Sequence, residues 1–456
     1  MLKPYKEYRY FGLPWLEEVP SHWLMLRNKN VLIEKKEVVG SSANNYLLLS
    51  LTLNGVIARD MINAKGKFPK DFNTYKVVEP GNLIFCLFDV DETPRTVGLS
   101  TLNGMITGAY DVFQPANING KYLYYYYLSI DNVKGLKPLY TGLRKVINIQ
   151  TFLGTKIPVP PKEEQDQIVR FLDWKLAKIN KLIRAKKKQI ALLNEQRQAI
   201  INNAVTKGLD PNVPMKDSGI EWIGQIPIHW NVIRLRGILS PVSIKNHPEL
   251  PLLSVVREKG VIVRDVKDKE SNHNFIPDDL SGYKVVQAGQ FVMNKMKAWQ
   301  GSYGISPYTG IVSPAYFVFD VNVKNKDYFH YSIRSKVYVN FFAQASNGIR
   351  VGQWDLNISK MKDIPFIVPS EEEQTLIIDY IKRTSKDIEV AITRFLNEIK
   401  LLQEYRTRLI SDVVTGKVDV RDIEIPEYEA DSDETIDDEI DDNLVLDEED
   451  GEMEVE

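Results

Sequence analysis

The sequence predicts an α/β chain of the α+β type, in which one domain plan occurs twice and each copy is followed by a long helix. Three observations support this prediction. The two halves of the 456-residue chain repeat each other at an offset of 204 to 209 residues. Within each half, short apolar runs punctuated by Gly, Asn and Pro are typical of strands. Each half then ends in about 40 residues with a heptad pattern, which is typical of a coiled coil.

The repeat is best seen in four pairs of phrases. WLEEVPSHW (15–23) returns as WIGQIPIHW (222–230), and YKVVEPGNLIF (75–85) returns as YKVVQAGQFVM (283–293). TGLRKV (141–146) matches NGIRVG (347–352), and PPKEEQDQI (160–168) matches PSEEEQTLI (369–377). His22 and His229 lie within the first pair, where a packed structural histidine and a ligand are both possible. This is a tandem duplication of a whole domain, because the offset is far longer than that of a solenoid repeat.

The duplication divides the chain into six parts. The predicted boundaries are a first domain over 1–158, a helix over 159–206, a linker over 207–220, a second domain over 221–368, a second helix over 369–416, and an acidic disordered tail over 417–456.

The two helices are predicted to pair with each other. The heptad seam of the first runs from Ile168 to Ala204, and the second repeats it from Ile377 to Val413. Two equivalent units that pair about a closed two-fold place their helices antiparallel, so we expect an antiparallel pair with pseudo-two-fold symmetry. Arg197 and Arg406 hold equivalent seam positions, where they either fix the register or extend into water.

The composition is that of an ordinary globular protein, with 43% hydrophobic and 26% charged residues. We expect a cytoplasmic protein, because no apolar run is long enough to span a membrane and the N-terminal residues do not resemble a signal peptide. The single cysteine, Cys86, lies in the apolar run LIFCLF, which favours a buried thiol over a nucleophile.

The net charge of −3 conceals a basic body. Of the 61 acidic residues, 18 lie between 424 and 456, a segment without Lys or Arg. The rest of the chain holds 43 acidic and 58 basic residues, an excess of 15 positive charges. Such a body is suited to a polyanion partner such as DNA. The tail either solubilises the chain or competes with nucleic acid for the basic surface.

No motif of an active site is recognisable. The sequence has no P-loop pattern, no GxGxxG, no HExxH and no paired Cys or Cys/His cluster with zinc spacing. The five histidines do not cluster in sequence. We therefore expect no catalytic residues, no metal ligands and no cofactor bound by this chain.

Basic and polar residues interrupt the strand pattern at matching places in the two copies. Such side chains on loops either donate to phosphates and base edges or are solvated charges. The candidate DNA-binding residues are Lys65, Lys67, Lys70, Arg95, Arg144 and Lys145 in the first copy, and Lys295, Lys297, Trp299, Gln300, Arg350 and Gln353 in the second. Arg144 and Arg350 are the strongest, because both follow Gly-Leu or Gly-Ile at equivalent positions. The run Tyr122 to Tyr127 is either a stacking platform for bases or a buried helix face.

These phrases resemble the specificity subunits of type I restriction-modification systems (the HsdS family). The resemblance rests on the paired Trp-Pro-His-Trp phrases, the domain ends IPVPPKEEQ and IPFIVPSEEEQ, and the helix ends AVTKG and VVTGK, and it covers about residues 10–420. It implies that each domain is a target recognition domain that reads one half of a bipartite sequence in double-stranded DNA. The helices would set the unread spacer and dock partner subunits.

The resemblance also implies where the chemistry lies. Family members are not catalytic alone. They bind two modification subunits that methylate adenine with S-adenosylmethionine, and restriction subunits that translocate DNA with ATP and Mg. Two other interpretations stay open from the residues alone: a coiled-coil adaptor that binds only protein, against which the basic body argues, and an independent nuclease or methyltransferase.

Overall fold

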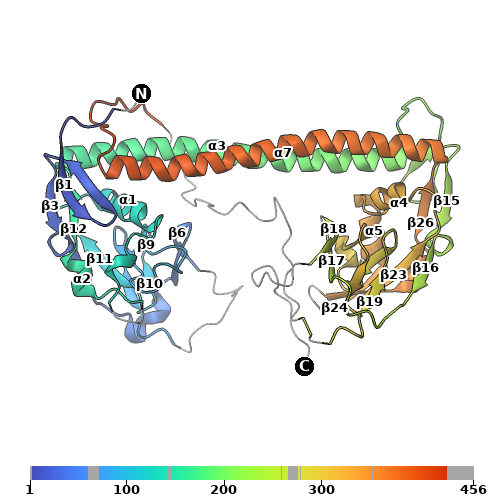
Figure 1. Ribbon diagram of the computed structural model, residues 1–456, viewed down its shortest axis with the longest axis horizontal. Helices are drawn as coiled ribbons and strands as arrows, with labels where there is room; N and C mark the ends of the chain where they lie inside the picture. The colour runs from blue at the N-terminus through green and yellow to red at the C-terminus, as the bar shows by residue number, and fades with distance from the viewer. Residues whose placement is uncertain are drawn as a thin grey trace. The chain divides into compact units, whose positions relative to one another are not determined.

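The computed structural model describes residues 3–59, 71–141, 145–257, 259–264, 276–277, 279–350 and 353–428. The chain forms two compact units (Figure 1). The first unit contains the chain up to Lys186 together with the segment that begins at Leu396. The second unit contains Lys187 to Phe395. Each of the two long helices therefore contributes one half to each unit.

The domain of the first unit is built from antiparallel pairs around a four-stranded sheet. That sheet has the order β4-β11-β8-β9, with β4 at Leu32–Lys35, β11 at Asp111–Pro115, β8 at Leu83–Phe85 and β9 at Val97–Leu99. The two-stranded pairs are β1 (Tyr8–Leu13) with β2 (Leu16–Pro20), β3 (Leu24–Arg27) with β12 (Lys156–Val159), β5 (Leu49–Thr52) with β6 (Gly55–Ala58), and β7 (Lys76–Val78) with β10 (Gly104–Ile106). Its helices are α1 (Gly120–Asp131) and α2 (Ile149–Gly154).

The domain of the second unit repeats this topology. Its four-stranded sheet has the order β16-β23-β20-β21, with β16 at Leu239–Val242, β23 at Tyr316–Val321, β20 at Phe291–Asn294 and β21 at Tyr303–Ile305. The corresponding pairs are β13 (Met215–Asp217) with β14 (Gln225–Pro227), β15 (Asn231–Arg234) with β26 (Pro365–Val368), β17 (Leu253–Val256) with β18 (Gly260–Val263), and β19 (Lys284–Val286) with β22 (Gly310–Val312). Its helices are α4 (Lys326–Ile333), α5 (Lys336–Ala345) and α6 (Ile358–Lys362).

Two features of the domains depart from the predicted plan. The segment 207–220, predicted as a linker, contributes β13 to the second domain, where Met215 to Asp217 pair with β14. The second domain also has a hairpin of β24 (Ser346–Arg350) and β25 (Gln353–Leu356). At the equivalent place in the first domain Thr141 pairs with Val146, and among the described residues there this is an isolated pairing. The copies therefore share a framework and differ at this loop.

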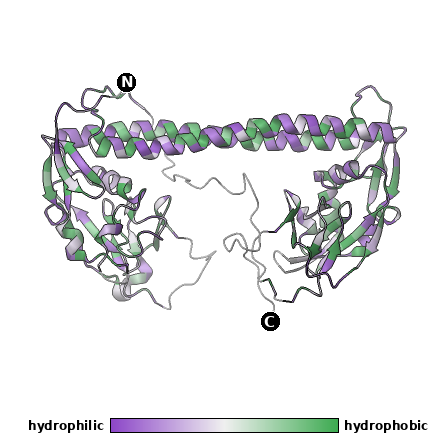
Figure 2. Ribbon diagram, in the orientation of Figure 1, coloured by the Kyte–Doolittle hydropathy of each residue, from purple (hydrophilic) through white to green (hydrophobic). Residues whose placement is uncertain are grey.

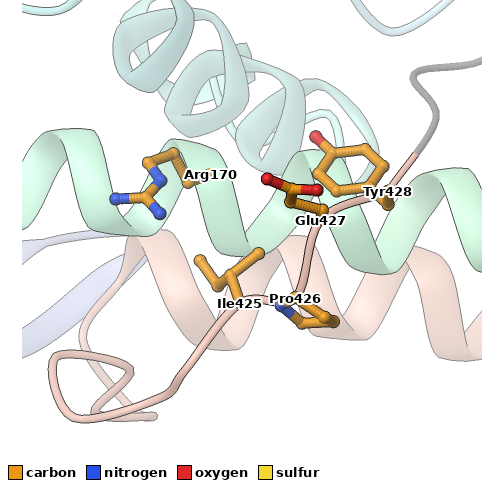
Figure 3. Close-up of a pocket in the computed structure, with 5 residues that line it drawn as sticks. All are labelled: Arg170, Ile425, Pro426, Glu427 and Tyr428. Atoms are coloured by element: carbon orange, nitrogen blue, oxygen red, sulfur yellow. The ribbon is translucent and has the colours of Figure 1, made fainter.

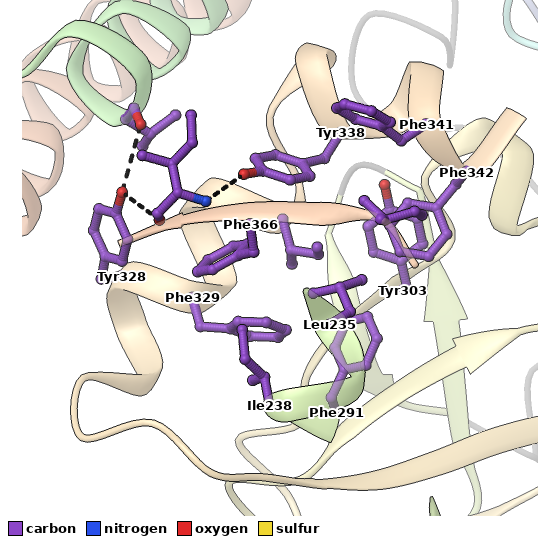
Figure 4. Packing of buried hydrophobic residues seen from close by; sticks show 14 of the residues in the cluster. Leu235, Ile238, Phe291, Tyr303, Tyr328, Phe329, Tyr338, Phe341, Phe342 and Phe366 are labelled. Atoms are coloured by element: carbon purple, nitrogen blue, oxygen red, sulfur yellow. Dashed lines mark hydrogen bonds between the residues drawn. The ribbon is translucent and has the colours of Figure 1, made fainter. Parts of the chain in front are cut away.

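Aromatic residues fill the core of the second domain, around β26 (Figure 4). The ring of Phe366 lies 5.2 Å from that of Phe329 and 5.4 Å from that of Tyr338. The Tyr338 hydroxyl accepts a 3.0 Å hydrogen bond from the backbone N–H of Ile367. The hydroxyl of Tyr328 donates to the same residue's carbonyl at 3.3 Å. The phenols of Tyr328 and Tyr338 thus both have a backbone partner, as is usual for buried polar groups.

The tyrosine run of the first domain is a buried helix face. Tyr122, Tyr125, Tyr126 and Tyr127 on α1 are all buried. Their hydroxyls bond within the protein, for example Tyr122 to the carbonyl of Pro158 at 2.9 Å. The possibility of a base-stacking platform is therefore wrong, because these rings are not accessible. Cys86 is also buried, as predicted, and burial raises the pKa of its thiol.

The long helices are α3 (Lys162–Lys207) and α7 (Glu371–Val414), and they pair antiparallel within each unit. In the first unit Asn180 contacts Arg406, and Lys186 forms an ion pair with Glu398. In the second unit Arg197 contacts Glu389, while Ile201 to Val205 pack with Ile377 to Ile381. In these contacts the residue numbers increase along α3 while they decrease along α7, so the two helices run in opposite directions. Hydrophobic and hydrophilic residues alternate along both helices (Figure 2), which confirms the predicted coiled coil.

The two seam arginines both find partners on the facing helix. Arg406 donates to the Asn180 side-chain oxygen at 3.3 Å. Arg197 lies 3.7 Å from a carboxylate oxygen of Glu389. Of the two alternatives for these residues, the structure favours register-fixing contacts across the seam.

The repeated Trp phrase attaches each domain to the first turn of its helix. In the first unit the indole N–H of Trp23 donates to Glu164 at 2.8 Å, and His22 Nε2 lies 2.8 Å from the same carboxylate. Tyr5 adds a 2.6 Å hydrogen bond, and Glu164 is only 5% exposed. In the second unit Trp230 and His229 contact Glu373 in the same way. Both histidines are therefore structural.

The same tryptophans also lie next to the C-terminal end of the other long helix. Gly416 follows α7, and a Cβ there would lie 3.2 Å from Trp23 and 2.3 Å from Pro20. Gly208 follows α3, and a Cβ there would lie 3.2 Å from Trp230. Both glycines have φ near +76°, the left-handed conformation that ends a helix and that glycine adopts without strain. This explains why AVTKG and VVTGK recur.

The segment after α7 is packed for longer than predicted. The backbone N–H of Asp419 donates to the Lys3 carbonyl at 2.8 Å, and Val420 is fully buried. The Gln167 side chain on α3 donates to the carbonyls of Val420 and Ile423 at 3.0 and 2.8 Å. The prediction of disorder is thus wrong for residues 417–428. Residues 429–456 lie outside the described residues.

Candidate nucleic-acid interface

Arg95 in the first domain is directed into the protein. Its side chain is 9% exposed, and it donates to Asp131 at 3.2 Å and to the Asn132 side chain at 3.1 Å. Asp131 also accepts from the backbone N–H and the hydroxyl of Thr96. Because the guanidinium is buried in this network, we assign Arg95 to the framework that joins β9 to α1 and no longer to the DNA-binding surface.

Lys145 lies on the loop that carries the Gly-Leu-Arg phrase, and it is bound to the loop after β8. Its ammonium lies 3.6 Å from Asp91 and contacts Glu92. The hydrogen bond to Glu92 raises the pKa of Lys145. The hydroxyl of Tyr140 donates to Asp91 at 2.6 Å, and this bond lowers the pKa of Asp91 to about 2. Lys145 therefore holds the loop in place with a side chain that is still 44% exposed.

Four further candidates of the first domain, Lys65, Lys67, Lys70 and Arg144, lie outside the described residues.

Four of the six candidates of the second domain lie in the turn after β20. Lys295 forms a 2.8 Å ion pair with Asp355 on β25. Lys297 precedes the short 3-10 helix η6 (Ala298–Gln300), which contains Trp299 and Gln300. The ring of Trp299 is stacked on that of Trp354, with 5.3 Å between centroids and 26° between planes. This turn and the hairpin β24–β25 thus form one continuous surface of the second domain.

Arg350 and Gln353 pair with each other across the closed end of the hairpin. Their side chains lie outside the described residues. Their backbone position places both next to the turn of the hairpin, which is the part of such an element that can enter a DNA groove.

Sequence reasoning did not identify the residues that hold these loops. Trp354 and Asp355 in the second domain, and Asp91 and Tyr140 in the first, are more than 40 residues from most of their partners. The one local signal was that Trp354 and Asp355 directly follow Gln353 in GIRVGQWD.

A hollow of about 520 Å³ is lined by Arg170, Ile425, Pro426, Glu427 and Tyr428 (Figure 3). It is open to solvent. Among the described residues no group of three or more His, Cys, Asp or Glu could hold a metal ion. No helix within the same residues has the length and apolar character to span a membrane.

Known proteins are similar to parts of this chain. The family described as "Type I restriction modification DNA specificity domain" matches residues 107–192, which include α1, β12 and the first part of α3. The type I restriction enzyme MjaVIII specificity subunit of Methanocaldococcus jannaschii is 24% identical over 302 residues, 62% of this chain and 66% of that protein. Over these parts of its length the chain is similar to type I specificity subunits.

Two further comparisons extend this result. The MjaX specificity subunit of the same organism is 25% identical over 282 residues, which are 60% of this chain and 62% of that protein. The aligned region is thus less than two thirds of either curated specificity subunit. A chain from a structure of a type I R-M system covers 88% of this chain and 99% of its own length, with a TM-score of 0.58 and 12% identity. That likeness shows a shared fold and confirms the predicted fold class.

Proposed function

We propose that this chain is the DNA sequence-specificity subunit of a type I restriction-modification complex, in which each domain reads one half of a bipartite target in double-stranded DNA. The observation that carries the proposal is the unequal duplication. The four-stranded sheets of both domains have the same strand order, yet the loops that follow β8 and β20, and the segments 141–146 and 346–356 that are attached to them, differ in sequence. A scaffold that is duplicated while its loops diverge is suited to recognise two different sequences.

The proposal extends to the partners of this chain. The antiparallel α3 and α7 would set the spacer between the two half-sites and dock two modification subunits. This chain would have no catalytic residues of its own. S-adenosylmethionine, ATP and Mg would be bound by modification and restriction subunits. The basic excess of the body supports binding to DNA.

A methylation map tests the proposal. Cells that express this chain with a modification subunit encoded beside it should methylate one motif of two short specific halves separated by a fixed gap. Exchange of one domain for that of another family member should change only one half. A continuous motif would contradict the two-domain reading. If no motif is methylated, the proposed function is contradicted, and the alternative of a coiled-coil adaptor that binds only protein is favoured.

Single substitutions separate the two halves. Arg144→Ala should weaken binding to the first half-site only, and Arg350→Ala to the second only. Loss of one base contact corresponds to about 1–3 kcal/mol of discrimination. Fluorescence anisotropy with duplexes that carry one intact and one scrambled half measures each effect. If either change weakened both half-sites equally, the assignment of these residues would be wrong.

A further inference from the structure

The hairpin β24–β25 is attached to its domain through its root. The backbone N–H of Leu356 donates to the carbonyl of Lys295 at 3.3 Å, and the backbone N–H of Asn357 donates to that of Ala345 at 2.9 Å. Ser346 is buried and its hydroxyl donates to the carbonyl of Phe342 at 2.8 Å. Beyond the root, Asn347 and Gly348 are exposed. The position of the outer part of the hairpin therefore depends on side-chain contacts.

Those contacts come mainly from two stacked indoles. Trp354 on β25 lies against Trp299 of η6 at a centroid distance of 5.3 Å, and both rings are half-buried. On the other strand Gly348 pairs with Trp354, and a Cβ at Gly348 would lie only 3.3 Å from the Trp354 ring. Trp354 is thus packed between the turn after β20 and the facing strand of its own hairpin. An offset aromatic stack fixes both the distance and the tilt of the two elements.

An ion pair on the adjacent residue restrains the same hairpin. Lys295 Nζ and Asp355 Oδ1 are 2.8 Å apart, and both side chains are about one third exposed. Solvent weakens a pair of that exposure, so its contribution is smaller than that of the stack. Lys295 and Trp299 therefore face the hairpin and are not directed toward an external ligand.

In the first domain the corresponding loop is attached by different contacts. The phenol of Tyr140 donates to Asp91, and the ammonium of Lys145 contacts Asp91 and Glu92. Backbone pairing of Phe88 with Val146 completes this attachment. Both loops are thus tied to the segment that follows the third strand of the four-stranded sheet, by polar contacts in one domain and by an aromatic stack in the other.

We propose that Trp299 and Trp354 are positioning residues that determine the specificity of the second domain, because their stack sets where the Arg350 end of the hairpin meets DNA. This inference rests on the proposed function. It changes the role expected for Trp299 and Lys295 from direct contact with DNA to orientation of the hairpin. It also predicts that the effect of disturbing the stack is confined to one half-site.

The experiment compares methylation maps of the full chain and its variants, each co-expressed with the modification subunit. Trp354→Ala and Trp299→Ala should relax the second half of the motif, with preference at one or more positions reduced at least about fivefold, the discrimination of one base contact. The first half should stay intact. Trp354→Phe keeps a ring against Trp299 and should retain the motif.

Three controls make the outcome decisive. Trp222→Ala removes another aromatic contact of the same unit, 5.4 Å from Phe341, and should leave both halves unchanged. Tyr140→Phe removes the hydroxyl bonded to Asp91 and should relax only the first half. Unfolding curves of the purified variants establish that each is folded at the growth temperature.

Each result has a defined meaning. A bipartite motif in the parent chain that Trp354→Ala leaves unchanged overturns the inference and leaves the proposed function standing. Equal losses from Trp354→Ala and Trp354→Phe also overturn it, because the stack would then not be the cause. If the parent chain itself gives no bipartite motif, the proposed function fails first.

Discussion

Replacing Glu164 tests whether the repeated Trp phrase is a structural attachment of the domain to its helix. In Glu164→Leu the helix propensity and side-chain volume change little, whereas the indole of Trp23 and the phenol of Tyr5 lose their acceptor. Both groups are buried, and each unsatisfied buried donor costs about 1–3 kcal/mol. His22 is 38% exposed and can bond to water instead. The expected loss is therefore about 4 kcal/mol.

The second unit supplies an internal comparison. Glu373 accepts from only one buried donor, Trp230, since His229 is 45% exposed. Glu373→Leu should therefore cost about 2 kcal/mol, half of the first effect. At about 2–4 °C per kcal/mol for a unit of this size, the melting temperature should fall by about 8–16 °C for Glu164→Leu and about 4–8 °C for Glu373→Leu.

Differential scanning calorimetry of the full chain measures both transitions. Glu163→Leu and Glu372→Leu are matched controls on the same helix turns, because both glutamates are exposed. Their melting temperatures should change by no more than a degree or so. The reasoning is refuted if Glu163→Leu is as damaging as Glu164→Leu, or if the two buried-site variants lose equal stability.

Three other predictions concern stability and charge. Gly81→Ala, Gly208→Ala and Gly416→Ala all place Ala at positive φ, but the added Cβ meets nothing at Gly81, Trp230 at Gly208 and the Pro20 ring at Gly416. Urea unfolding should therefore show losses of stability that increase in that order, from about 1 kcal/mol upward. Equal losses in the three variants would contradict this prediction. Burial lowers the pKa of His330 from 6.5 to about 4, with Arg334 adding to the effect, so protonation favours the unfolded chain; the stability is complete above pH 6.5 and is lost as pH falls through about 4. Between pH 7 and pH 5 the wild type should lose about 2 kcal/mol more than His330→Gln in urea titrations, and identical pH profiles would count against it. Deleting residues 429–456, just beyond the packed segment, should tighten non-specific DNA binding at low salt and have little effect at high salt, as measured by anisotropy; a tail that only solubilises the chain would leave both affinities unchanged.

The architecture could be predicted because it depends on local sequence patterns. A heptad seam from Ile168 to Ala204 specifies a paired helix wherever it occurs, and the second copy repeats it. The duplication predicted that the two domains share one framework, and their four-stranded sheets have the same strand order. The bounds of α3 and α7 differ by only a few residues from the predicted ones, since Pro and Gly mark the ends of both helices.

The roles of individual side chains were decided by contacts between distant parts of the chain. Arg95 and Lys145 were both predicted as loop cations. Arg95 is buried in an ion pair with Asp131, whereas Lys145 is partly exposed and forms an ion pair with Asp91. The tyrosines of α1 could be either exposed or buried until the strands around them were placed.

The sequence by itself therefore determined the duplicated α+β plan, the coiled coil, the basic body and the acidic end of the chain. Only the tertiary structure decided that Trp23 and Trp230 attach each domain to its helix, and that Trp354 orients a hairpin through Trp299. The physical reason is that periodicity and charge are properties of neighbouring residues. A hydrogen bond or a stack instead requires two groups within a few ångströms, and the partners here are separated by 55 to more than 140 residues.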